Sequence, residues 1–177
     1  MRRAVVGLKA GATLAYPTEA VYGLGCDPFD PAAVARLMEL KGRPEGKSFI
    51  LIAADLGQLE GLIAPLNEES LGRLCSTWPG PVTWVVPAAA TVPAWLVGRD
   101  RTLAVRVTAH PLAAALCRAF GGALISTSAN PGGKPPARTP LKVRRYFGNA
   151  VRLLAGPLGT DPKPTAIYEL RTGRRLR

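Results

Sequence analysis

Short apolar segments alternate with capped helical segments along almost the whole chain, and this alternation limits the folds that are open to it. The clearest helix is predicted to start after the N-cap Asp30, to carry Pro31 at its first position and to end at Gly42. Further helices are predicted to begin at Asp55, Asn67, Pro111 and Thr139, and Gly121 and Gly148 close the last two. Strands are predicted at 13–16, 49–53, 82–86, 103–108, 123–126, 151–154 and 166–170.

This order of elements predicts an α/β fold made of one domain, residues 1–177, with helices on both faces of a twisted sheet. Some connections are too short for parallel crossovers, so we expect a mixed sheet of parallel and antiparallel strands. Residues 18–25 are polar and punctuated by glycine, and no strand is predicted there.

The ends and the cysteines predict a soluble cytosolic protein. The N-terminal apolar stretch is interrupted at Lys9 and is too short for a signal peptide, and no apolar run approaches the ~18 residues of a membrane span. Three scattered cysteines and a single histidine, His110, do not form a zinc-binding pattern. Such thiols are typical of small buried side chains in a reducing compartment.

The net charge favours anionic partners. Twenty-three Lys and Arg residues against 12 Asp and Glu residues leave a formal charge of +11. Nucleotides, nucleic acid or an anionic membrane surface are attracted to such a protein. A cationic surface that only aids solubility explains the composition equally well.

Three cations, Lys41, Arg43 and Lys47, fall within seven residues at the predicted helix end and in the loop after it. Gly42 and Pro44 hold them in a tight turn, which suits an oxygen-rich triphosphate. Alternatively, Lys41 complements the helix dipole and the other two are solvated.

Hydroxyl and amide groups follow a predicted strand at Ser126, Thr127, Ser128 and Asn130, just before two glycines. Hydroxyls in such a loop can donate to phosphate oxygens, and glycine lets the backbone approach closely. An ordinary Ser/Asn turn is the alternative. Arg106 lies inside an apolar strand and must point outward or face an anion, either a substrate carboxylate or a structural Asp or Glu.

Several enzyme classes are not supported. One histidine and no G-x-S-x-G motif argue against a Ser-His-Asp hydrolase, and no carboxylate pair suggests a glycosidase. A reaction that needs positioning and charge stabilisation, such as transfer at phosphorus, fits better.

Five blocks of this sequence, in order and over nearly the whole chain, resemble the YrdC-like threonylcarbamoyl-AMP synthases. The blocks are 16–25 (YPTEAVYGLG), 41–44 (KGRP), 78–83 (WPGPVT), 103–107 (LAVRV) and 126–130 (STSAN). The resemblance implies a mixed α/β sheet around a basic cavity. It also implies synthesis of threonylcarbamoyl-adenylate and pyrophosphate from L-threonine, bicarbonate and ATP, with Mg²⁺ accompanying the nucleotide. Partner proteins would then transfer the threonylcarbamoyl group to tRNA, and the chain resembles the short bacterial type without a further domain.

The same resemblance assigns roles to individual residues. Catalysis is assigned to Lys41 and Arg43. The ATP-binding residues are Lys41, Arg43, Lys47, Thr102, Ser128, Asn130 and Arg177, and the threonine-binding residues are Thr18, Ala20, Arg106 and Ser126. Many family members carry threonine where this chain has Ala20, histidine where it has Ile52 and a Ser-Thr pair where it has Pro164-Thr165.

Two other functions compete with this reading. An RNA-binding protein would use the basic concave surface, although only eleven aromatic residues are present for stacking. Its support is the net charge and the arginines outside the proposed pocket, Arg144, Arg145, Arg171, Arg174 and Arg175. Weak RNA binding could also accompany the enzyme. A carbamoyl transferase acting on another amine is the second alternative.

Overall fold

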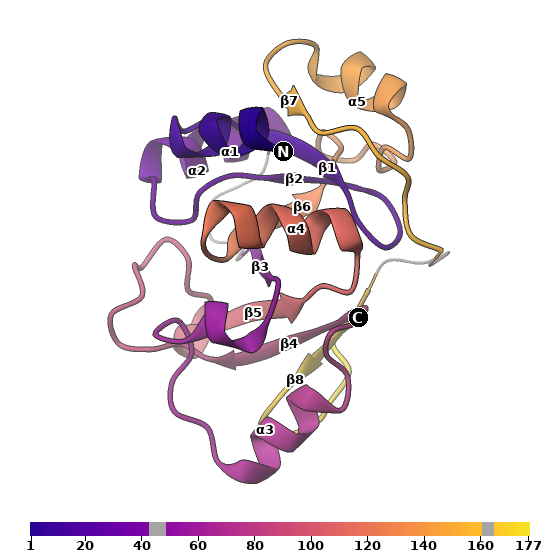
Figure 1. Ribbon diagram of the computed structural model, residues 1–177. Helices are drawn as coiled ribbons and strands as arrows, with labels where there is room; N and C mark the ends of the chain where they lie inside the picture. The colour runs from indigo at the N-terminus through magenta and orange to yellow at the C-terminus, as the bar shows by residue number, and fades with distance from the viewer. Residues whose placement is uncertain (43–48, 161–164) are drawn as a thin grey trace.

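The computed structural model describes residues 1–42, 49–160 and 165–177, except for the side chain of residue 99 (Figure 1). Its eight strands form a sheet in the order β7-β1-β2-β6-β3-β5-β4-β8. The strands are β1 (Leu14–Pro17), β2 (Tyr22–Gly25), β3 (Ile50–Ala53), β4 (Val82–Pro87), β5 (Thr102–Val107), β6 (Leu124–Ser128), β7 (Arg152–Leu153) and β8 (Ala166–Glu169). The helices are α1 (Arg2–Lys9), α2 (Pro31–Lys41), α3 (Glu68–Cys75), α4 (Pro111–Phe120) and α5 (Pro140–Phe147), with short 3-10 turns η1 (Leu56–Leu59) and η2 (Arg99–Arg101).

The sheet is mixed, as predicted. β1 with β7, β3 with β5, and β4 with β8 are parallel pairs. The other neighbours, β1 with β2, β2 with β6, β3 with β6, and β4 with β5, are antiparallel. The sheet therefore passes from β7 at the top of Figure 1 to β8 at the bottom.

Two apolar clusters cover the two faces of the sheet. In one, Leu8 of α1 and Leu116 of α4 pack with Ile52 of β3. In the other, Leu37 of α2 packs with residues such as Leu51, the neighbour of Ile52 along β3. Because adjacent strand residues point to opposite faces, α1 and α4 lie on one face and α2 on the other. The prediction of helices on both faces is confirmed.

Helix ends follow the capping residues. The Asp30 carboxylate accepts hydrogen bonds from the backbone of Ala32 and Ala33, and Gly42 ends α2 in the left-handed region, with φ 56°. Asn67 and Thr139 cap α3 and α5 in the same way. These boundaries agree with the sequence predictions.

Three elements differ from the predictions. The predicted helix from Asp55 is only the 3-10 turn η1, and α1 was not predicted. The glycine-rich segment after β1 contains a strand, β2. Its Gly25 is required by close packing, because a Cβ atom there would lie 2.2 Å from the carbonyl oxygen of Ile125. Glycine is common in loops, so the composition of this segment did not indicate a strand. In the structure its glycines permit the close approach of neighbouring strands.

Candidate functional site

A cavity of about 540 Å³ lies on the α4 face of the sheet. Residues two apart on a strand face the same side. Ile52 packs in the α1/α4 cluster and Ile50 lines the cavity, so α4 covers one end of this face and leaves the other end open. Ser126 and Ser128 of β6 and Ala104 of β5 continue the floor.

Two segments form opposite walls of the cavity. The turn between β1 and β2 contributes Thr18 and Ala20, and the region of β8 contributes Thr165, Ile167 and Arg177. The walls are polar and cationic around Arg106 and apolar towards Ile167. The cavity is therefore suited to a ligand with both charged and apolar parts.

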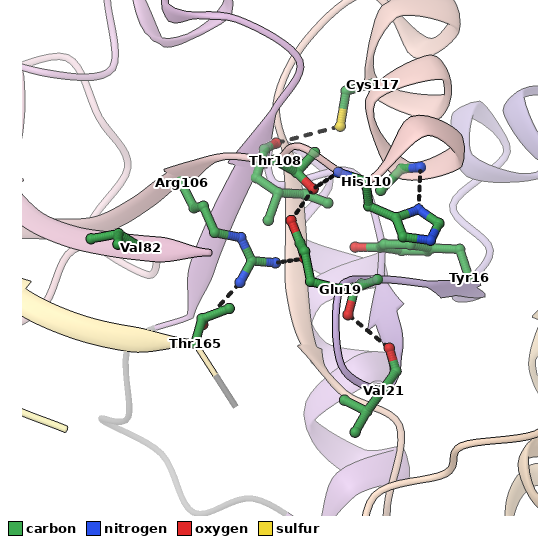
Figure 2. A network of polar contacts seen from close by, with 12 residues as sticks. Tyr16, Glu19, Val21, Val82, Arg106, Thr108, His110, Cys117 and Thr165 are labelled. Carbon is green, nitrogen blue, oxygen red and sulfur yellow. Dashed lines mark hydrogen bonds and ion pairs between the residues drawn. The ribbon is translucent and has the colours of Figure 1, made fainter. Parts of the chain in front are cut away.

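Arg106 is the central charged group of the floor, and Figure 2 shows it between Glu19 and Thr165. Its Nη2 lies 3.2 Å from Glu19 Oε2, and its Nη1 donates to Thr165 Oγ1 at 2.9 Å. Arg106 is only 5% exposed and Glu19 only 6%. The sequence left open whether Arg106 faces a ligand or a structural acid. In the structure it lines the cavity and also pairs with an acid.

A second layer of hydrogen bonds fixes Glu19 (Figure 2). Thr108 Oγ1 donates to Glu19 Oε1 at 2.5 Å and accepts from the backbone N–H of His110 at 3.2 Å. The His110 ring contacts the carbonyl oxygen of Pro157 through Nε2 at 3.1 Å. Glu19 is thus held from β5 and from the start of α4, and its carboxylate has a defined position beside Arg106.

Residues 154–160 run across the β1–β2 turn as a strap. Tyr22 donates its hydroxyl proton to the carbonyl of Gly156 at 2.7 Å, and Gly159 N–H donates to the carbonyl of Thr18 at 3.0 Å. A Cβ atom on Gly159 would lie 2.7 Å from the Glu19 carbonyl oxygen. The strap therefore packs directly on the turn that carries Thr18 and Glu19.

Lys41 joins the end of α2 to the loop after β6. Its Nζ donates to the carbonyl oxygens of Ser128 at 2.6 Å and Asn130 at 3.0 Å, and its own carbonyl accepts from Gly132 N–H at 2.7 Å. Lys41 is only 7% exposed. The two motifs that the sequence singled out as phosphate-binding, around Lys41 and around Ser128, are therefore in contact.

The structure brings most of the predicted site residues together. Thr18, Ala20, Arg106, Ser126, Ser128 and Arg177 line the cavity. Lys41 and Asn130 are absent from the described lining. Lys41 Nζ donates to the carbonyl of Asn130, and the Asn130 Nδ2 donates to the carbonyls of Pro131 and Lys134. Thr102 begins β5 but is absent from the described lining. Arg43, Lys47 and Pro164 lie outside the described residues.

Arg177 is the second described cation of the cavity. Its Nη2 donates to the carbonyl of Thr165 at 3.0 Å. Partial desolvation, and then repulsion from Arg106, lower the pKa of the Arg177 guanidinium, although the residue as a whole is exposed. Both arginines contact Thr165 and line the same cavity, so both can act on one ligand.

Sequence reasoning assigned no individual role in the site to Glu19, Thr108 or Thr165. Glu19 stands between the predicted residues Thr18 and Ala20, and Thr165 belongs to the Pro164-Thr165 pair noted as a departure. An arginine within an apolar strand is a signal that a buried acid exists somewhere, but it does not say which one.

A second concavity, of about 600 Å³, lies between the α1–β1 connection and α2. Its described lining includes Thr13, Arg36 and Glu39, and none of the predicted site residues described in the structure. Arg36 is engaged there with the carbonyl of Gly11 at 2.7 Å. Of these two concavities, only the one around Arg106 is lined by predicted site residues among the residues that the structure describes.

Comparison with known proteins identifies the family of this chain. The family model for Sua5, YciO and YrdC, described as telomere recombination, matches residues 7–176. The chain belongs to the Sua5/YciO/YrdC family. Among curated relatives, the threonylcarbamoyl-AMP synthase of Nitrosococcus oceani is 56% identical over 96% of this chain and 92% of its own length. That of Halorhodospira halophila is 55% identical over 100% of this chain and 93% of its own.

Solved structures of the Sua5/YciO/YrdC family share the fold. P. abyssi Sua5 complexed with L-threonine has a TM-score of 0.89 and 32% identity, over 98% of this chain. The match covers 52% of the Sua5 chain, so this chain spans about half of that protein. E. coli YciO has a TM-score of 0.82 and 27% identity over 94% of this chain and 82% of its own.

Proposed function

We propose that this protein is a threonylcarbamoyl-AMP synthase, which forms threonylcarbamoyl-AMP and pyrophosphate from L-threonine, bicarbonate and ATP. The observation that carries the proposal is the cavity floored by Arg106, Ser126 and Ser128, in a chain 55–56% identical to two threonylcarbamoyl-AMP synthases. In reaction class the enzyme would be a nucleotidyltransferase, because an adenylyl group moves from pyrophosphate to a carbamate oxygen.

The substrates divide between two parts of the site. Arg106, which is 5% exposed and shares the cavity lining with Thr18 and Ser126, would hold the threonine carboxylate. The loop at Ser128 and Asn130, anchored by Lys41, would hold the ATP phosphates together with Arg177. Arg43 and Lys47, outside the described residues, complete this phosphate-binding set in the proposal.

The chemistry requires no protein nucleophile. The neutral amine of threonine attacks the carbon of bicarbonate, water leaves, and a carbamate forms. A carbamate oxygen then attacks the α-phosphorus of ATP, and the bond to the bridging oxygen breaks as pyrophosphate leaves. The reactants are anionic, so their approach in water is opposed by repulsion, and fixed cations in a partly dry cavity offset that repulsion.

Mg²⁺ is proposed as the companion of ATP, bound through phosphate oxygens, which are its preferred ligands. Within the described part of the chain, no group of three or more His, Cys, Asp or Glu side chains is arranged to hold a metal ion. In the proposal, MgATP is therefore the substrate that enters the cavity.

Pyrophosphate release tests the proposal. With MgATP and bicarbonate, we expect release with L-threonine, much weaker release with L-serine and almost none without an amino acid. Omitting bicarbonate should abolish the threonine-dependent part. Equal release with threonine and without an amino acid would refute the proposal, and preference for another amine would support the carbamoyl transferase alternative.

Other expectations from the sequence stay predictions. RNA binding and transfer of the product to tRNA by partner proteins are of this kind, and so is a cytosolic location. No helix among the described residues has the length and apolar character needed to cross a bilayer.

A further inference from the structure

The two described arginines of the cavity differ in their counter-charges. Glu19 lies 3.2 Å from Arg106 and neutralises it. The Arg177 side chain donates to a neutral group, the carbonyl of Thr165, at 3.0 Å. The Arg106 half of the cavity therefore contains a compensated ion pair, whereas the Arg177 guanidinium contacts a neutral carbonyl.

Glu19 is placed where it changes charge without offering a contact. Its side chain is 8% exposed, and it is absent from the described lining to which Arg106 belongs. Thr108 fixes one carboxylate oxygen and Arg106 lies beside the other. A ligand in the cavity can therefore contact the Arg106 guanidinium directly. The Glu19 carboxylate acts on that ligand only through its electrostatic potential. Buried charges interact strongly because little water screens them.

We propose that Glu19 sets the ligand selectivity of the Arg106 half of the cavity, making it accept a zwitterionic amino acid and reject phosphate-like anions. This inference rests on the proposed function, in which the substrate carboxylate binds Arg106. Glu19 is thus a selectivity and positioning residue that acts through Arg106.

The reason lies in how each ligand responds to the charge of Glu19. An amino acid zwitterion has no net charge, so a change in the local potential alters its binding free energy little. Inorganic phosphate has close to two negative charges at pH 8 and responds about twice as strongly as a single charge. An uncompensated Arg106 would therefore attract phosphate, pyrophosphate or the ATP tail into the amino acid site.

The test is competition between inorganic phosphate and L-threonine, measured by titration calorimetry at pH 8 without ATP. Competition isolates the Arg106 half, because phosphate bound elsewhere does not displace threonine. Glu19→Gln keeps the size and a hydrogen-bonding oxygen but removes the charge. We expect it to strengthen phosphate competition by about tenfold. The affinity for threonine should change by less than about threefold.

Two further variants separate charge from geometry. Glu69→Gln makes the same change at an exposed ion pair with Arg73 on α3 and should leave both affinities unchanged. Glu19→Asp keeps the charge while lengthening the contact, and phosphate competition should stay close to that of the parent protein. Equal strengthening in Glu19→Asp and Glu19→Gln would overturn the charge explanation.

The parent protein supplies a test that does not depend on the folding of any variant. If phosphate already displaces threonine from it with comparable affinity, the proposal is wrong. Unchanged phosphate competition in a folded Glu19→Gln protein that still binds threonine also overturns it. Absence of threonine binding and of threonine-dependent pyrophosphate release from the parent protein would instead contradict the proposed function.

Discussion

At the scale of single residues, the site depends on cations that are held by the protein before any ligand arrives. Lys41 contacts two backbone carbonyls, and Arg106 contacts Glu19 and Thr165. Each of these side chains would lose much conformational entropy if it were ordered only on binding. Prior ordering therefore favours binding of anionic ligands and fixes where their charges lie.

Replacement of Lys41 tests how much this ordering contributes. Lys41→Met keeps the aliphatic stem but removes the donor that joins α2 to the carbonyls of Ser128 and Asn130. We expect threonine-dependent pyrophosphate release to fall roughly ten- to thousandfold, the range for loss of one electrostatic stabiliser. Stability should fall by about 1–3 kcal/mol, because buried carbonyls lose a charged partner.

Steady-state kinetics and urea unfolding of the same preparation measure the two effects of Lys41→Met. Lys9→Met is a control on α1, where Lys9 is exposed in the last turn. It should stay near parent values in both measurements. Wild-type turnover in the Lys41 variant would contradict the role of Lys41.

The sequence predicted residues of the site better than it predicted their mutual contacts. Thr18, Ser126 and Arg106 belong to blocks that resemble one family, and all three line the cavity. The pairing of Arg106 with Glu19 was not predicted, because 86 residues lie between them along the chain and several acids could have met Arg106. The tertiary fold, which brings the β1–β2 turn beside β5, decides which acid lies next to Arg106.

At the scale of elements, the strap of residues 154–160 determines the position of the β1–β2 turn. It leaves β7, contacts Tyr22, His110 and Thr18 in succession, and leads towards Thr165 and β8. The strap thus leaves one edge strand of the sheet, β7, and packs on the turn beside the cavity. Movement of the strap would displace Thr18 and Glu19 together.

A pair of glycine substitutions tests this packing. Gly159→Ala places a methyl group 2.7–2.8 Å from the backbone of Glu19, which cannot yield as a flexible side chain would. We expect lower stability by about 1–3 kcal/mol and a raised KM for threonine. Gly72→Ala on α3 should instead stabilise by about 0.5–1 kcal/mol, since no described atom lies within 4 Å of its Cβ position.

Thermal unfolding and measurements of the KM for threonine on both alanine variants test whether the strap holds the β1–β2 turn in place. Equal changes in melting temperature and KM in Gly159→Ala and Gly72→Ala would show that the strap does not pack tightly against the turn. A lower melting temperature with unchanged threonine KM would show that it matters only for folding.

Elements with strong end signals were predicted well and those without them were not. Asp30 and Gly42 mark α2 at both ends, and both caps form. The helix expected from Asp55 has a cap, but Gly57 and Gly61 interrupt the segment after it, and only η1 forms. The strand β2 was missed because Gly23 and Gly25 serve close packing against neighbouring strands.

At the scale of the whole molecule, three acidic groups in the core hold their protons more tightly than they would in the unfolded chain. Burial raises the pKa of the Cys26 and Cys117 thiols to about 12. It also raises the pKa of the Tyr16 phenol well above its usual value. All three side chains are fully buried in the two apolar clusters. Their ionisation is therefore linked to unfolding of the whole chain.

The sign of this linkage predicts alkaline sensitivity. The unfolded chain releases these protons near pH 9–10 and the folded chain does not, so stability is present below pH 8 and falls as pH rises. Between pH 8 and pH 10 we expect a loss of about 3 kcal/mol from the three groups together. Urea unfolding at pH 8, 9 and 10 measures it.

The two buried thiols account for most of that expected loss. The double variant Cys26→Ala, Cys117→Ala should be less stable at pH 8 because packing is lost, yet it should lose under about 1 kcal/mol between pH 8 and pH 10. Cys75→Ala removes an exposed thiol and should keep the full pH dependence of the parent. If the double variant loses as much stability as the parent, the buried thiols are not the cause. The alkaline loss of stability would then come from the titration of other groups, such as the lysines of the basic surface.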